Sequence, residues 1–111
     1  MKNKILTIFC LIALFSLVVF AQKNGLPVFK KGQSYSSVRT KMLKAGWKPF
    51  HAEDADECMS GDKRCEDRPE MESCAGTGMA NCRFLWKRKD KTVVIFTIGE
   101  EANYDGHEFE K

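Results

Sequence analysis

The chain lacks the short motifs that mark common enzyme and metal-protein classes. It has no C-x-x-C pair, which zinc ribbons and thiol–disulfide oxidoreductases use, and no G-x-S-x-G nucleophile motif. The Gly76–Gly78 stretch lacks the lysine and the following helix of a phosphate-binding loop, so it predicts a turn. The acidic run Asp54–Glu57 fails as an EF-hand loop, because Cys58 and Met59 stand where an oxygen ligand and a glycine are needed. We therefore expect neither a metal nor a cofactor.

A large excess of charge of one sign is also absent. The chain has 18 Lys and Arg against 15 Asp and Glu, so losing Lys2 and Lys4 with a signal peptide would leave a net charge of +1. A charge this small gives no global field for nucleic acid or for anionic lipid. The charges are nevertheless segregated, since residues 22–48 carry seven basic groups and no acid, whereas residues 49–75 carry nine acids and three bases. This pattern fits either a self-complementary surface or a polarised face that binds a charged partner.

The first residues resemble a secretory signal peptide. Lys2 and Lys4 precede the apolar run Ile5–Phe20, and Ala21 ends a sequence suited to cleavage before Gln22. The alternative is a retained membrane anchor, but a helix of this length spans only about 24 Å of a hydrocarbon core about 30 Å thick. We therefore predict a signal peptide over residues 1–21, a single small domain over residues 22–111, and a periplasmic or secreted protein.

Cleavage would also remove Cys10 and leave an even set of cysteines: Cys58, Cys65, Cys74 and Cys82. A small exported domain has a limited core, and disulfides are the usual additional source of stability. Sequence alone allows three pairings. We favour Cys58–Cys65 with Cys74–Cys82, because both bonds close short loops, and each would contribute about 2–3 kcal/mol of stability.

The clearest helical pattern covers residues 35–45. Ser34 is a suitable N-cap, apolar residues including Leu43 recur at helical spacing, and Gly46 suits the left-handed position after the last turn. Pro49 prevents the helix from continuing.

The strand signals come mostly later in the chain. Residues 82–87 alternate as a strand, Thr92–Ile98 reads as a central strand, and Tyr104–Phe109 as an edge strand. Leu26–Phe29 is a further possible edge strand, while residues 50–81 read as a loop with one possible helical turn at Pro69–Glu72. The predicted fold class is α+β: one main amphipathic helix packed on a three- to four-stranded antiparallel sheet, with a disulfide-stapled loop.

The acidic part of this loop is the candidate binding surface. It comprises Glu53, Asp54, Asp56 and Glu57, to which we add the aromatic residues Trp47 and Trp86. Buried tryptophans would belong to the core instead, whereas exposed ones would indicate a binding surface. His51 and His107 are possible general bases, although no nucleophile motif accompanies them.

Two stretches of the chain together resemble a group of small exported proteins of Gram-negative bacteria. They are residues 31–49, with the pattern G-x-S-Y-x-x-V-R followed by G-W-x-P, and residues 69–86, with P-E-x-x-x-C-x-G-T-G followed by C-R-F-x-W. The resemblance implies location and fold rather than an activity. The helix opening also resembles SmpA/OmlA-type envelope proteins and β-lactamase-inhibitor-like domains, which implies a helix packed against a small antiparallel sheet.

These observations favour binding over catalysis. We expect a monomeric periplasmic protein that binds a periplasmic or envelope protein as an inhibitor, an immunity-type protein or an accessory factor. We expect no nucleic-acid partner and no stable membrane insertion after cleavage. The alternatives are a small enzyme that uses His51, His107 and the acidic loop, and a structural component of the envelope.

Overall fold

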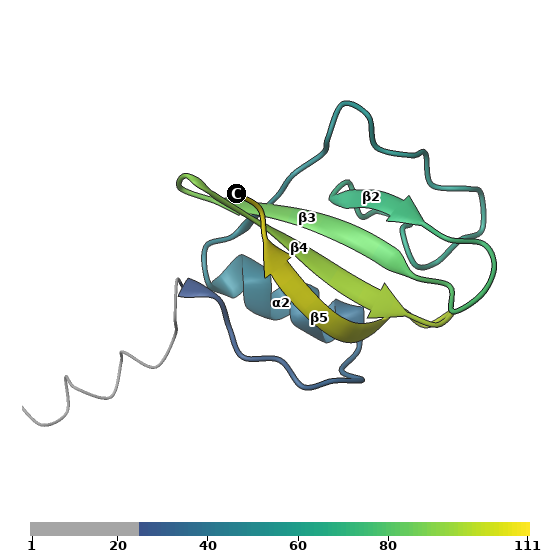
Figure 1. The fold of residues 1–111 in the computed structure, drawn as a ribbon, viewed down its shortest axis with the longest axis horizontal. Coiled ribbons are helices and arrows are strands. Elements are labelled where there is room, and N and C mark those ends of the chain that lie inside the picture. The colour runs from purple at the N-terminus through teal and green to yellow at the C-terminus, as the bar shows by residue number, and fades with distance from the viewer. Residues whose placement is uncertain (1–24) are drawn as a thin grey trace, which may run out of the picture.

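The computed structural model describes residues 25–111, so the predicted signal peptide and its cleavage site lie outside the described residues. One helix, α2 (Tyr35–Lys44), packs on one face of a five-stranded antiparallel sheet (Figure 1). The strands are β1 (Lys48–Pro49), β2 (Met71–Cys74), β3 (Cys82–Arg88), β4 (Lys91–Ile98) and β5 (Asn103–Phe109). The predicted α+β class is confirmed, although the sheet has more strands than the three or four expected.

The extra strand arises because two short strands share one edge of β3. The main strand order is β1-β3-β4-β5, and β2 also pairs with β3. β1 pairs with the half of β3 that ends at Arg88, and β2 with the half that begins at Cys82. The two segments meet at Leu85, whose carbonyl accepts from the Phe50 N–H at 3.0 Å and whose N–H donates to the Glu70 carbonyl at 2.8 Å.

Two predicted local structures were wrong. Leu26–Phe29 is not a strand; Leu26 instead places its side chain in the core at 7% exposure. The predicted helical turn at Pro69–Glu72 is replaced by a turn that leads into β2 at Met71. The open edge of β3 offers this segment partners for its backbone groups, which a single isolated helical turn would leave largely unpaired.

The helix ends follow from their sequence. The Ser34 hydroxyl accepts from the Ser37 N–H at 3.3 Å, as an N-cap does. At the other end Gly46 has φ +87°, and its N–H donates to the Leu43 carbonyl at 3.1 Å. The Trp47 N–H donates to the Met42 carbonyl at 3.0 Å, which completes a Schellman motif.

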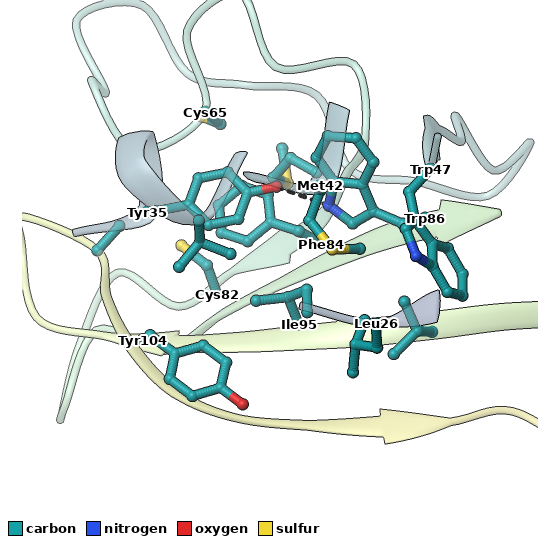
Figure 2. Packing of buried hydrophobic residues seen from close by; sticks show 14 residues of the cluster. Leu26, Tyr35, Met42, Trp47, Cys65, Cys82, Phe84, Trp86, Ile95 and Tyr104 are labelled. Carbon is teal, nitrogen blue, oxygen red and sulfur yellow. Dashed lines mark hydrogen bonds between the residues drawn. The ribbon is translucent and has the colours of Figure 1, made fainter. Parts of the chain in front are cut away.

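The main core lies between α2 and the sheet (Figure 2). It includes three helix residues and three β3 residues, each fully buried: Tyr35, Val38, Met42, Cys82, Phe84 and Trp86. Leu43, predicted to widen the apolar stripe of the helix, is 47% exposed instead. A smaller apolar cluster of Ala52, Leu85 and Val94 covers part of the opposite face of the sheet.

The two tryptophans belong to this core, so their assignment to a binding surface was wrong. Trp47 is 1% exposed and Trp86 is fully buried. Each indole N–H has an internal acceptor, since Trp47 donates to the Gly25 carbonyl at 3.0 Å and Trp86 to the Tyr35 hydroxyl at 3.0 Å. A small domain needs such large side chains inside, because they contribute the most buried apolar area per residue.

Two disulfides close the short loops. The structure joins Cys58 to Cys65 and Cys74 to Cys82, which is the pairing that the loop lengths favoured. Cys74 and Cys82 lie directly opposite each other on β2 and β3, so this bond fastens the end of the long loop to the sheet.

The helix end gives a test of the fold. Gly46→Ala should lower the free energy of unfolding by about 1–2 kcal/mol, because a side chain at positive φ strains the backbone. Space is not the cause, since the nearest atom to an added Cβ would be Arg88 Nε at 3.6 Å. Gly76→Ala is the matched control: its φ is not positive and its surroundings are open, so it should change stability by less than about 0.5 kcal/mol. Urea denaturation measures both, and equal effects would contradict the left-handed assignment of Gly46.

Candidate functional site

An open groove of about 890 Å³ lies between two segments of the long loop that precedes β2. One wall comes from residues 51–58 and the other from residues 65–71. The groove carries three of the predicted binding residues, Glu53, Asp56 and Glu57, and adds a fourth carboxylate from Asp67. The structure therefore gathers most of the predicted acidic surface around one hollow.

Three cross-links hold the walls together. They are a 3.1 Å contact between His51 Nδ1 and the Pro69 carbonyl, a 2.9 Å hydrogen bond from the Asp56 N–H to the Glu72 carbonyl, and the Cys58–Cys65 disulfide. Because a carbonyl oxygen only accepts, His51 Nδ1 is the donor in this contact. The groove is thus braced along its length by contacts within the chain itself.

A buried carboxylate fixes the second wall to the helix. Glu70 is fully buried, and Arg39 donates to it through Nε at 2.7 Å and through Nη2 at 3.3 Å. The Tyr35 hydroxyl donates to the same carboxylate at 2.8 Å. It also accepts from the Trp86 indole N–H at 3.0 Å (Figure 2). Both oxygens of Glu70 therefore have donors, as a buried carboxylate requires.

The arginine in the groove wall is held by the helix rather than by the groove acids. The Arg68 guanidinium lies 4.8 Å from the centre of the Tyr35 ring, and its Nη2 donates to the Ser36 hydroxyl at 2.9 Å. The ion pairs within residues 25–111 use other acids, namely Asp105, Glu70, Asp62 and Glu72. Within this part of the chain the four groove carboxylates therefore have no basic partner.

A second arginine, Arg64, binds two parts of the long loop and its exit. Arg64 binds Asp62 through two nitrogens, at 2.9 and 2.7 Å, and the guanidinium holds the pKa of that carboxyl below its usual value. The same guanidinium donates to the Ala75 carbonyl at 2.8 Å and to the Ala80 carbonyl at 3.3 Å. It thus links the loop closed by the first disulfide to the loop closed by the second.

The remaining predicted site residues do not converge. Asp54 is exposed but does not line the groove. His51 lines it, whereas His107 lies on β5, across β3 and β4 from the edge of the sheet that leads into the groove. There its Nδ1 is 2.6 Å from the Tyr104 hydroxyl. The shared cleft that a two-histidine enzyme needs is not present among residues 25–111.

The groove chemistry suits a positively charged ligand. Its carboxylates can accept several hydrogen bonds from ammonium or guanidinium groups. Among the described residues no group of three or more His, Cys, Asp or Glu is placed to hold a metal ion. The four cysteines of this part of the chain are all in disulfides, so it offers the groove no thiol nucleophile.

Sequence reasoning missed Asp67 and Arg68 as groove residues and Glu70 as the buried anchor. One signal could have indicated Glu70. Tyr35 and Arg39 stand four residues apart, so they share a helix face, and Tyr35 belongs to the predicted buried stripe. A buried hydroxyl and an adjacent guanidinium need a common acceptor, and the nearby acidic loop supplies it.

No protein-family model, curated protein or solved structure matches this chain. Its function is therefore inferred from the groove and from the distribution of surface charge.

The buried carboxylate generates a stability prediction. Glu70→Ala should lower the free energy of unfolding by about 3–5 kcal/mol, because it leaves Arg39 and Tyr35 without their acceptor inside the protein. The control is Glu72→Gln, which breaks the 2.7 Å pair with Arg83, whose side chain is 43% exposed. That change should cost no more than about 1 kcal/mol. If urea denaturation gave equal losses, Glu70 would not be the anchor of the wall.

The two tyrosines generate a pH prediction. Burial and the adjacent Glu70 raise the pKa of Tyr35 well above its usual value, and burial raises the pKa of Tyr104. A folded-state pKa above the unfolded value means that the stability is complete below about pH 10 and is lost as the pH rises through the folded pKa. Phenolate absorbance near pH 10 should therefore be well below half of its maximum in the native protein, but about half in denaturant.

Tyr104→Phe isolates the signal of Tyr35, since the chain has two tyrosines. Equal native and denatured titration curves in this variant would contradict burial of the Tyr35 hydroxyl beside Glu70.

Proposed function

We propose that this is an exported periplasmic protein that binds a basic segment of a protein partner in its acidic groove. The observation that carries the proposal is the braced groove, in which four carboxylates lack basic partners within residues 25–111. Unpaired acids on two facing walls give the groove a negative potential, which favours a positively charged ligand. Here the nearest arginine is turned toward the helix instead.

Export is supported by the sequence and by the disulfides. The basic start, the apolar run and the small residue at Ala21 fit a cleaved signal peptide. Two disulfides fit a protein that folds in an oxidising compartment. The described residues include no helix with the length and apolar character that crossing a membrane requires.

A basic protein segment fits the groove better than a small cation does. The carboxylates are spread along both walls, which suits several lysine or arginine side chains on one extended segment. Met59 follows the groove residue Cys58 and is 78% exposed, so it offers a flexible apolar contact beside the charges. The wall cross-links reduce the entropy lost on binding, because the groove already has its shape.

The small size and the absence of a catalytic constellation in the described residues favour a role as an inhibitor, an immunity-type protein or an accessory factor of the envelope. We expect the protein to act as a monomer. The resemblance to small exported proteins of Gram-negative bacteria belongs to the same proposal. No observation favours the structural-component or the histidine-enzyme alternative.

Neutralising the groove tests this function. Glu53→Gln, Asp56→Gln and Glu57→Gln combined should weaken partner binding about tenfold to a hundredfold, since each charge contributes about 0.5–1 kcal/mol. The matched control neutralises three exposed acids away from the groove, Glu101, Glu108 and Glu110. The immobilised native protein first captures partners from a periplasmic extract, and the affinity of each salt-eluted protein is then measured for all three forms.

The proposal predicts a partner that binds the native and control proteins equally and the groove variant weakly. It would be wrong if every captured protein bound the groove variant as tightly as the native chain, or if capture did not weaken with added salt.

A further inference from the structure

The end of the sheet where β3 turns into β4, next to the end of α2, carries an excess of positive charge. Six basic residues contribute to it, and we call this surface the basic end: Lys41, Lys44, Lys48, Lys87, Arg88 and Lys89. In Figure 1 the turn between β3 and β4, which forms its tip, lies at the left of the view, whereas most of the long loop before β2 lies at the upper right. Along β3, Arg88 is four residues from Phe84, which pairs with groove residue Met71, so the separation is about 13 Å.

The fold gathers these residues at one end of the sheet from three elements, with Lys41, Lys44 and Arg88 on the helix side and Lys48 and Lys87 on the opposite face. The last turn of α2 contains Lys41 and Lys44. β1 follows at once and places Lys48 directly opposite Lys87 of β3. The next residue, Arg88, lies near the end of the helix, since its Nε would be 3.6 Å from a Cβ at Gly46.

This clustering is unfavourable within the protein itself. Like charges directly opposite each other on paired strands destabilise a sheet, as for Lys48 and Lys87. Within the described residues the only ion-pair, hydrogen-bond or ring partner of either ammonium group is the Phe50 ring, whose centre lies 3.8 Å from Lys87 Nζ. No ion pair within residues 25–111 involves any of the six basic residues. The acids closest along the sheet are Asp90 in the β3–β4 turn and Glu110, whose N–H donates to the Thr92 carbonyl at 2.9 Å. Two acids do not neutralise six bases, so the basic end retains a net positive field.

An exposed apolar side chain lies beside these charges. Val28 is 76% exposed and lines a small hollow together with Lys41, Lys44 and Ala45. Lysines next to exposed apolar side chains are typical of surfaces that contact the interface of an anionic membrane.

The path of the chain favours a membrane over other anionic partners. A side chain at Gly25 would clash with the Arg88 guanidinium, so the described chain begins at the basic end. Only residues 21–24 separate Gly25 from the apolar run that ends at Phe20. Fully extended, this connection reaches about 17 Å. While the signal segment is still in the membrane, the basic end is therefore held close to the lipid headgroups.

We propose that the basic end is a peripheral docking surface for the anionic phospholipid headgroups of a membrane. Docking there directs the acidic groove away from the lipid, because a negative surface repels its carboxylates. The small net charge of the chain gives no indication of this surface, because the acids near the groove balance the bases of the basic end. The inference rests on the proposed export but not on what the groove binds.

Vesicle cosedimentation tests the proposal with the chain from Gln22 to Lys111, which contains every core residue of the described fold. One set of vesicles contains equal parts of phosphatidylcholine and phosphatidylglycerol, and the other contains phosphatidylcholine alone. Binding should occur to the anionic set, weaken with salt, and fall on the order of tenfold or more in the variant Lys44→Gln, Lys48→Gln and Lys89→Gln. The control replaces three exposed lysines elsewhere, Lys30, Lys31 and Lys63, and should bind as the native chain does.

Several outcomes would overturn the proposal. They are equal binding to both vesicle sets, equal loss in the two lysine variants, or complete displacement by inorganic phosphate at an ionic strength where sodium chloride displaces little. The last result would indicate a site for free phosphate rather than a lipid surface. The groove variant should bind anionic vesicles at least as well as the native chain, so failure of this test is distinguishable from failure of the proposed groove function.

Discussion

The carboxylate of Glu70 and its donors are the interaction on which the rest of the structure depends. Burial of a charged group is unfavourable unless its oxygens are paired, and here Arg39 and Tyr35 supply the donors from the helix. The same residue gives its backbone carbonyl to Leu85 of β3. One residue of the long loop is therefore joined to both the helix and the sheet. These contacts hold Glu70 in place, and they therefore also fix the position of the neighbouring groove wall.

The charge segregation along the sequence is only partly neutralised in the fold. Ion pairs connect basic segments to acidic ones at Arg39–Glu70 and Arg83–Glu72. The acids of the groove and the bases of the basic end are left unpaired at separate places. A self-complementary surface and a polarised surface were alternatives at the level of sequence, and the structure combines them. The charges that form ion pairs lie at the junction of helix, loop and sheet. The charges without ion pairs lie in the groove and at the basic end.

Sequence signals within a few residues predicted well the elements whose limits depend on neighbouring residues. The limits of α2 follow from a capping serine and a left-handed glycine, and β4 follows from its β-branched residues. β2 was missed because Met71–Cys74 contains a glutamate and a serine and has no strong strand preference; it forms because β3 offers it an edge. Predicting the groove would also have required knowing which distant segments of the chain pack together. Three of its four acids, Glu53, Asp56 and Glu57, could be seen in the sequence as a charged loop, but nothing local indicates that residues 51–58 lie against residues 65–71.

The connectivity of the disulfides bears on how the chain matures. Each bond joins a cysteine to the next one along the described chain, over separations of seven and eight residues. Loops this short cost little entropy to close, so each cysteine meets its neighbour along the chain more often than a distant one. A chain that crosses a membrane from its N-terminus presents Cys58 and Cys65 before Cys74 and Cys82. Oxidation in order of emergence then favours the two native bonds over pairings that skip a cysteine.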